Sequence, residues 1–215
     1  SSGNAAGDGT RAFRSLPALS VYANDSAGDD LIHLNPADGS FNTDFTSFDL
    51  FPVLDTRAVA LGRIDGDIFD DLAIVYVDLA NVFVNWYPGT GTGTFATTPG
   101  NTSTAPMASE SDSLSPRDVE LADLTRDGRP EIVFNLESLG FRVCSASGED
   151  LLMGDAAAGA EQLEIGDINA DGLPDVVTLG SEIRVYLNES GSSLALNDAW
   201  AAPTGTTSIA LADID

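Results

Sequence analysis

The sequence predicts an all-β fold of the β-propeller type, with about four blade-sized repeats that form part of a larger, for example seven-bladed, ring. Three observations predict it. An acidic loop of nine residues recurs along the chain, its copies are spaced by the length of one blade, and short runs of alternating apolar and polar residues follow each copy.

The acidic loop is clearest at residues 167–175, where Asp, Asn and Asp alternate, a glycine follows and a further Asp closes the run. We call this run loop C, and the related runs at residues 123–131 and 63–71 loop B and loop A. A shortened copy begins at Asp213. The four first positions, residues 63, 123, 167 and 213, lie 60, 44 and 46 residues apart. Intervals in the forties are typical of a propeller blade of four strands.

Each loop leads into an apolar strand, and a second strand with period-two alternation follows. In residues 181–187, for example, Ile183, Val185 and Leu187 share one face. Two strand-like runs near the beginning, residues 21–25 and 30–34, indicate an earlier blade whose loop has decayed.

These repeats divide the chain. We expect a flexible leader over residues 1–15 and propeller blades over residues 16–215, at about 16–62, 63–122, 123–166 and 167–212, with the chain cut at the start of a further repeat. Residues 97–116 are rich in Ser, Thr and Pro, and we expect them to form an irregular insertion that lengthens the first interval.

The composition excludes some partners. The chain has 34 Asp and Glu against 9 Arg, no Lys and a formal charge of −25. Such a surface repels nucleic acid, and no apolar run approaches the roughly 20 residues that membrane insertion needs. A divalent cation is the partner that this charge favours.

The loop spacing is typical of calcium chemistry. Ca²⁺ takes about six to eight oxygen ligands, and alternate side chains at positions 1, 3 and 5 can point to one centre. The carbonyl at position 7 and the acid at position 9 can complete the cage. An EF-hand differs because its closing acid stands at position 12 and a helix follows. In loop C, position 12 is Thr178 and the continuation is strand-like.

The expected Ca²⁺ ligands come from loops C and B, with weaker candidates in loop A and in the shortened copy that begins at Asp213. They are Asp167, Asn169, Asp171, Leu173 (carbonyl) and Asp175; Asp123, Thr125, Asp127, Arg129 (carbonyl) and Glu131; and, as weaker candidates, Asp65, Asp67, Asp71, Asp213 and Asp215.

Loop A departs from the pattern because Arg63 replaces the first acid and Ile68 replaces the glycine. We expect the guanidinium of Arg63 to substitute for the cation by a bidentate pair with Asp67 or Asp71. The alternative is that Arg63 points to solvent and Ca²⁺ binds through the remaining oxygens.

The pattern Asp-x-Asn-x-Asp-Gly-x-x-Asp before a strand resembles the FG-GAP and VCBS repeats, the calcium-loop blades of integrin-α-like propellers. The resemblance covers most of the chain from about residue 16. It implies a propeller fold, calcium held for structure, and an extracellular or cell-surface location.

From this resemblance we expect a secreted or cell-surface, non-catalytic protein that acts in cell adhesion or in lectin-like binding of a glycan or protein ligand. Two alternatives stay open: a propeller-type enzyme, such as a polysaccharide lyase or a phytase-like hydrolase, and a purely structural envelope or fibre component. The single His and the absence of Lys and of Gly-x-Ser-x-Gly weigh against an enzyme.

Overall fold

The computed structural model describes residues 21–24, 30–34, 46–49, 55–78, 81–91, 95–106, 116–137, 139–153 and 159–212. The chain divides into two compact units, residues 1–52 and 53–215. Every regular element in the described part is a β-strand, which confirms the predicted all-β fold. None of the described residues forms a helix with the length and apolar character needed to cross a bilayer.

The first unit contains one antiparallel sheet of three strands, in the order β1-β2-β3. These strands are β1 (Val21–Asn24), β2 (Asp30–Leu34) and β3 (Thr46–Asp49). The first two lie where the alternating pattern predicted strands. The predicted leader, residues 1–15, lies outside the described residues.

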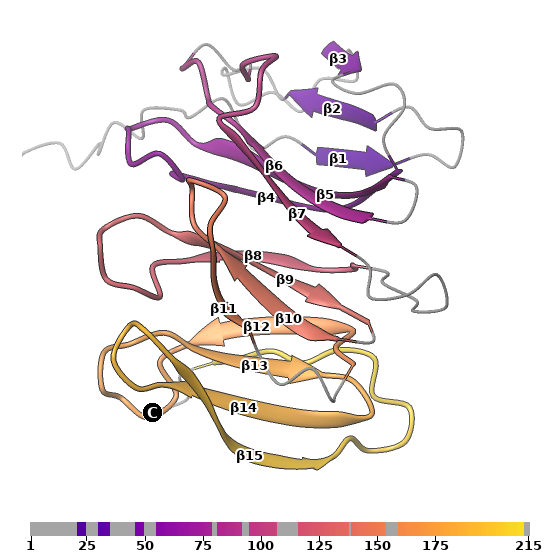
Figure 1. The fold of residues 1–215 in the computed structure, drawn as a ribbon. Helices are drawn as coiled ribbons and strands as arrows, with labels where there is room; N and C mark the ends of the chain where they lie inside the picture. The colour runs from indigo at the N-terminus through magenta and orange to yellow at the C-terminus, as the bar shows by residue number, and fades with distance from the viewer. Residues whose placement is uncertain are drawn as a thin grey trace, which may run out of the picture. The chain divides into compact units, whose positions relative to one another are not determined.

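The second unit contains three four-stranded antiparallel sheets, each with its strands in chain order (Figure 1). Sheet A consists of β4 (Asp55–Gly62), β5 (Asp71–Asp78), β6 (Asn81–Tyr87) and β7 (Asn101–Pro106). Sheet B consists of β8 (Val119–Ala122), β9 (Glu131–Leu136), β10 (Gly140–Cys144) and β11 (Asp150–Met153). Sheet C consists of β12 (Gln162–Gly166), β13 (Asp175–Leu179), β14 (Glu182–Asn188) and β15 (Leu194–Ala201).

Each acidic loop joins the first strand of its sheet to the second. The units predicted from the sequence begin at the loops, whereas the sheets begin one strand earlier. This strand, β4, β8 or β12, pairs with the strand after the loop in register, as Gly166 opposite Asp175 shows. The loop is therefore a hairpin connection whose two ends are held together by its own sheet.

The expectation of an irregular insertion over residues 97–116 is wrong for part of that segment. Residues Asn101–Pro106 form β7, which pairs with β6 along its whole length. Because β7 is the outermost strand of sheet A, it needs no apolar face, and its Ser- and Thr-rich sequence gave no hydrophobic alternation. Residues 107–115 lie outside the described part of the chain.

Sheets A and B pack through one hydrophobic cluster, to which strands of both sheets contribute. Its most buried members include Val75 and Val82 from sheet A and Phe134 from sheet B. Close approach is possible because a Cβ on Gly62 would lie 2.7 Å from the side chain of Leu121. The indole of Trp86 also donates a hydrogen bond of 2.9 Å to the carbonyl oxygen of Ala146.

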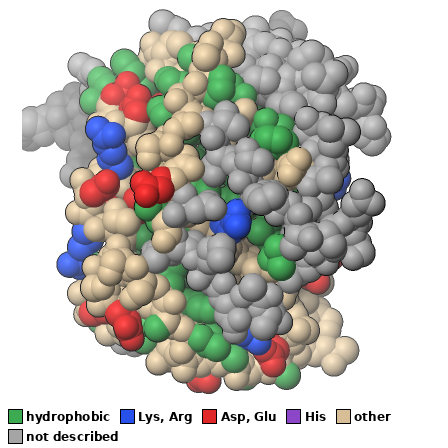
Figure 2. All heavy atoms as spheres, in the orientation of Figure 1, with side chains coloured by type: hydrophobic (Ala, Val, Ile, Leu, Met, Phe, Trp, Pro, Cys, Tyr) green, Lys and Arg blue, Asp and Glu red, His purple; other side chains and the backbone are tan. Residues whose placement is uncertain are grey.

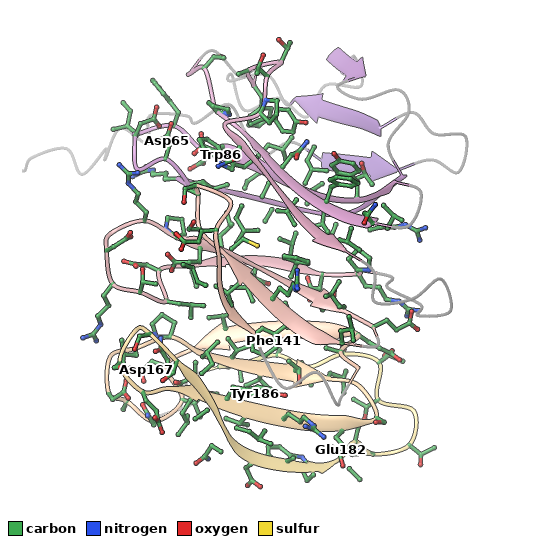
Figure 3. The ribbon with its side chains drawn as sticks, viewed as in Figure 1. Asp65, Trp86, Phe141, Asp167, Glu182 and Tyr186 are labelled. Atoms are coloured by element: carbon green, nitrogen blue, oxygen red, sulfur yellow. The ribbon has the colours of Figure 1, made fainter. Side chains whose placement is uncertain are left out.

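Sheets B and C pack through a second cluster, in which Phe141 and Tyr186 meet edge to face with ring centroids 5.1 Å apart. Figure 3 shows these two side chains between the sheets. Such aromatic pairs contribute about 0.5–1.5 kcal/mol beyond the area that they bury. The three sheets thus form a stack held by two apolar interfaces.

Position 2 of each loop shows how the stack is built. Ile64 in loop A and Leu124 in loop B are fully buried, and they belong to the first and second interface respectively. The equivalent Ile168 in loop C is 43% exposed. Loops A and B therefore each supply an apolar side chain to the interface with the following sheet, whereas the side chain at this position of loop C is partly exposed.

Candidate metal centre

Loops A, B and C leave the second unit at the same edge of the three sheets, to the left in Figure 1. Figure 3 shows Asp65 of loop A and Asp167 of loop C on this side. The repeat in the sequence therefore becomes a row of acidic loops along one edge.

The residue at position 9 anchors each loop. Its carboxylate is buried in all three loops, and it accepts a hydrogen bond of 2.8 Å from the backbone N–H at position 2. The three pairs are Ile64 to Asp71, Leu124 to Glu131 and Ile168 to Asp175. A buried carboxylate needs such donors, and these bonds fold the beginning of the loop back onto the strand that follows it.

The carboxylate at position 1 orders the middle of loops B and C. Asp167 accepts hydrogen bonds from the N–H groups of Asp171, at 3.1 Å, and Gly172, at 2.8 Å. Asp123 accepts the equivalent bonds from Asp127 and Gly128. These bonds use the loop's own acids to satisfy its backbone donors, as short polar side chains do in turns.

Two left-handed residues bend loops B and C. Position 6 is a glycine with φ of 90° in loop B and 85° in loop C. Position 4 is also left-handed, and there it is Arg126 and Ala170, each with φ of 59°. Loop A has its glycine at position 4 instead, as Gly66 with φ of 83°. The glycine that loop A lacks at position 6 is thus partly replaced by one two positions earlier.

Three carboxylates converge in loop A. One ligand atom from each of Asp65, Asp67 and Asp71 lies within 4.8 Å of the other two. Among the described residues, these three form the group of His, Cys, Asp or Glu side chains whose ligand atoms come this close together. We call it the acid triad. The sequence pattern ranked loop A as a weaker calcium site than loops B and C. Among the described residues, however, the acids converge most closely in loop A.

Arg63 does not pair with the triad residues named in the sequence prediction. Its Nε lies 3.8 Å from a carboxylate oxygen of Asp70, at position 8 of the same loop. Both side chains are largely exposed, at 56% and 42%. An exposed ion pair of this length contributes little stability, and it leaves the charge of the triad to be offset by something else.

The polar side chains of loops B and C bond to one another. In loop C, the amide nitrogen of Asn169 donates to a carboxylate oxygen of Asp171 at 2.8 Å. In loop B, the hydroxyl of Thr125 donates to Glu131 at 3.0 Å. These contacts bring positions 3 and 5 together in loop C, and positions 3 and 9 together in loop B.

The remaining predicted ligands lie as follows. Leu173 is half-buried and its N–H donates to Asp171 at 2.8 Å, while Arg129 is exposed and its N–H donates to Asp127 at 2.8 Å. Asp213 and Asp215 lie outside the described residues.

Burial changes the acidity of the anchoring residues. It raises the pKa of Asp71 above the ordinary value of 3.8, against the opposing effect of hydrogen bonds from backbone N–H groups, and the charge of Asp65 adds to the rise. Burial likewise raises the pKa of Glu131 above 4.5. Both carboxylates are therefore less stable in the charged form than in water, and a nearby cation would reverse this.

Arginines of loop B reach the two neighbouring loops. The guanidinium of Arg126 donates to the carbonyl oxygen of Gly172 in loop C. The side chain of Arg129 passes over Gly66 in loop A, with Cγ 3.6 Å from the position of an added Cβ. Figure 2 shows acidic and basic side chains beside one another along the left edge of this face. Loop B thus brings positive charge to both flanking loops.

Sequence reasoning missed the residues that hold position 9 from the other side. Gly89 donates its N–H to Asp71 and Asn188 donates its N–H to Asp175, each at 2.8 Å. Gly89 lies just after β6 and Asn188 is the last residue of β14, 18 and 13 residues from the carboxylate that they contact. No local motif marks them, because the contact exists only once β5 and β6, or β13 and β14, have paired.

Residues 63–134 match a family model described as an FG-GAP-like repeat. The matched segment begins with loop A and ends within β9, so it includes the acid triad and the whole of loop B.

No curated protein matches the sequence of the chain. Among solved structures, it is similar to a chain in the crystal structure of BBS1N in complex with ARL6DN, with 12% identity, a TM-score of 0.49, and coverage of 86% of this chain and 46% of that one. It is also similar to the exotype rhamnogalacturonan lyase YesX, with 10% identity, a TM-score of 0.46, and coverage of 78% and 30%. The chain spans less than half the length of either structure.

Proposed function

We propose that this chain is a calcium-binding, non-catalytic part of a secreted or cell-surface β-propeller that binds a protein or glycan partner. The acid triad carries the proposal. Three carboxylates within 4.8 Å repel one another strongly unless a cation or protons offset their charge, and they stand in a segment that matches the FG-GAP-like repeat.

The donor set of the triad fits Ca²⁺. All its ligand atoms are carboxylate oxygens, which a hard cation prefers. One oxygen of Asp65 and one of Asp67 accept backbone N–H groups, from Asp67 and Phe69, and these bonds fix the direction of each carboxylate. Asp65, Asp67 and Asp71 would hold the ion, and the ion would supply positive charge that keeps the three groups together.

Loops B and C are proposed as further Ca²⁺ sites. Both keep acids at positions 1, 5 and 9 and a left-handed glycine at position 6. In loop C, the amide of Asn169 would have to turn its oxygen toward the ion, since its nitrogen now bonds to Asp171. Amide oxygens are ordinary ligands of Ca²⁺.

A binding role outside catalysis is supported by the chemistry that the chain offers. It has a single His and no Lys, and the acids of the loops are engaged with backbone N–H groups. Trp200 on β15 is 47% exposed, and exposed Trp side chains are common in binding sites for proteins and sugars. We propose this outer strand as part of the partner-binding surface.

Thermal unfolding tests the proposal. Extracellular Ca²⁺ modules bind with Kd of about 10⁻⁴–10⁻³ M, so about 5–10 mM Ca²⁺ nearly saturates them. Relative to excess chelator, one such site should raise Tm by about 3–10 °C, because the ion binds only the folded chain. Mg²⁺ at the same concentration should have a smaller effect, since it requires a tighter octahedral site.

A matched pair of variants gives the control. The triple variant Asp67→Asn, Asp127→Asn and Asp171→Asn removes one loop carboxylate from each loop and should lose the Ca²⁺ response. Replacing three exposed acids elsewhere, by Glu149→Gln, Glu189→Gln and Asp198→Asn, changes the net charge equally and should retain it. A wild-type Tm that is the same in chelator and in Ca²⁺ would sink the proposal.

A further inference from the structure

Asn188 is the last residue of β14 and is fully buried, with 0% of its surface exposed. Its backbone N–H donates to Asp175 at 2.8 Å. Its side-chain nitrogen donates to the carbonyl oxygens of Leu124, at 2.8 Å, and Pro174, at 3.2 Å. Its side-chain oxygen accepts the N–H of Gly191 at 2.8 Å. All these polar groups are therefore satisfied, as a buried amide requires.

These bonds join two loops of different sheets. Leu124 is position 2 of loop B, whereas Pro174 and Asp175 are positions 8 and 9 of loop C. Residues 188 and 124 lie 64 positions apart in the chain. Asn188 thus connects the backbone at the start of loop B directly to the carboxylate that closes loop C.

The backbone of loop B is fixed from both sides at this point. The N–H of Leu124 donates to Glu131 at 2.8 Å, while its carbonyl oxygen accepts from Asn188. The turn after β14 also lies close to the backbone of Thr125, since a Cβ on Gly191 would lie 3.0 Å from the carbonyl oxygen of that residue. Asn188 is therefore hydrogen-bonded to both Asp175 and position 2 of loop B, and the turn that follows it lies against position 3.

Sheet A shows what the arrangement is without the side chain. There Gly89 takes the place of Asn188 and donates its N–H to Asp71 at 2.8 Å. A Cβ on Gly89 would lie 2.3 Å from the carbonyl oxygen of Asp70, so this position has no room for a side chain. The support of position 9 is common to both sheets, whereas the side-chain link to a preceding loop is specific to Asn188.

We propose that Asn188 is a positioning residue that couples loops B and C, so that a cation bound in loop C raises the affinity of loop B for a second cation. The inference rests on the proposed calcium binding of the two loops. An ion in loop C orders Asp175 and, through Asn188, the peptide of Leu124. The second ion then binds a loop whose conformational freedom is already reduced, which gives positive cooperativity.

The experiment measures coupling by Ca²⁺ calorimetry. The affinity of loop B for Ca²⁺ is measured in the wild-type chain and in a chain whose loop C is disabled by Asp171→Ala. The ratio of the first affinity to the second is the coupling factor. Measurable allosteric coupling corresponds to a ratio of about 5 or more, and we expect such a ratio in the wild type. Asn188→Gly copies the natural arrangement at Gly89, retains the N–H that contacts Asp175, and should reduce the ratio to about 1. Asn188→Ala is the second variant, with the same expected result.

Asn135 provides a control for a merely structural effect. It is also fully buried, and it joins sheet B to the segment just before β12 of sheet C, because its side-chain nitrogen donates to the carbonyl oxygen of Ala160 at 2.7 Å. It lies in β9 away from the loop edge, where its side-chain oxygen accepts the N–H groups of Arg117 and Asp118. Asn135→Ala should lower Tm as the Asn188 variants do but keep the coupling factor of the wild type.

The outcomes separate the two proposals. If the wild type binds no Ca²⁺ at either loop, the proposed function fails and the coupling with it. If both loops bind but the wild-type ratio is 1, or if Asn188→Gly keeps the wild-type ratio, the coupling is overturned while calcium binding stands. An equal loss of coupling in Asn135→Ala would also overturn it, because any weakening of the interface would then suffice.

Discussion

Arg63 and Asp70 form an ion pair of 3.8 Å at the surface of loop A, and this pair holds the guanidinium beside position 8 of the loop. The three acids of the triad converge without it. Charge compensation in loop A by Arg63 is therefore weaker than its place in the sequence predicted, and the triad is the part of the loop where a cation has the most to offset.

The triad and the neighbouring Asp70 give a sharp comparison for loop A. Asp67→Asn should lower the Ca²⁺ affinity of this loop about tenfold, or about 1.4 kcal/mol, because it removes one of three converging charges. Asp70→Asn removes the same charge outside the triad and should change affinity less than about threefold. Calorimetry in a chain with loops B and C disabled measures both, and equal losses would contradict the assignment of the triad.

A second comparison ranks loops B and C. Asp171→Ala should reduce Ca²⁺ affinity more than Thr125→Ala, since it removes a carboxylate rather than a neutral hydroxyl. The Thr125 hydroxyl also donates to Glu131. Without this hydroxyl, the buried carboxylate keeps two backbone donors, the N–H groups of residues 124 and 125. Titration of each single variant by calorimetry decides the order, and similar losses would mean that loop C is not the stronger site.

The apolar residue at position 2 predicts a large difference in stability between loops. Ile64→Ala removes a fully buried side chain from the interface of sheets A and B, and such changes cost about 2–5 kcal/mol. Ile168→Ala makes the same change at a side chain that is 43% exposed and should cost less than about 1 kcal/mol. Urea denaturation in excess chelator measures both without a contribution from Ca²⁺.

Glu120 on β8 predicts a pH dependence. Burial raises its pKa above the ordinary value of 4.5, and the charges of Asp118 and Glu164 raise it further. The folded chain thus holds this proton more tightly than the unfolded chain. Stability from Glu120 is fully present below pH 4.5 and is lost as pH rises through the folded pKa.

The test compares unfolding free energies in chelator at neutral pH and near pH 5. The wild type should be more stable at the lower pH, and Glu120→Gln, which cannot ionise, should show a smaller difference and higher stability at neutral pH. Part of the pH dependence should remain in this variant, because burial also raises the pKa of Asp71 and Glu131. A Glu120→Gln chain that is less stable than the wild type at neutral pH would contradict the prediction.

Much of the fold could be predicted from local sequence patterns. Alternation in residues 181–187 predicted β14, and the loop pattern predicted where β9 and β13 begin. Strand β7 was not predicted, because an outermost polar strand has no alternation of apolar and polar residues in its sequence. The division into sheets also depends on pairing before each loop, which a pattern that begins at the loop does not contain.

The candidate site was less predictable than the fold. Carboxylates at fixed spacing indicated the loops, but their convergence in loop A depends on the left-handed Gly66 and on backbone donors that reach Asp71 from Gly89. Arg63 has several acids within reach, and spacing alone does not select Asp70. Asn188 stands outside every motif, since its partner Leu124 lies in loop B, which belongs to another sheet's first hairpin.

The two tryptophans of the chain stand in opposite surroundings. Trp86 is 8% exposed and its indole bonds to Ala146 across the interface of sheets A and B, whereas Trp200 is 47% exposed on β15. Light emission from a buried, hydrogen-bonded indole shifts to longer wavelength when water reaches it, while emission from Trp200 is already that of a wetted ring. A Trp200→Phe chain therefore keeps Trp86 as its single tryptophan. When tryptophan is excited selectively over tyrosine, its emission reports whether sheets A and B are together, with no dye or label attached.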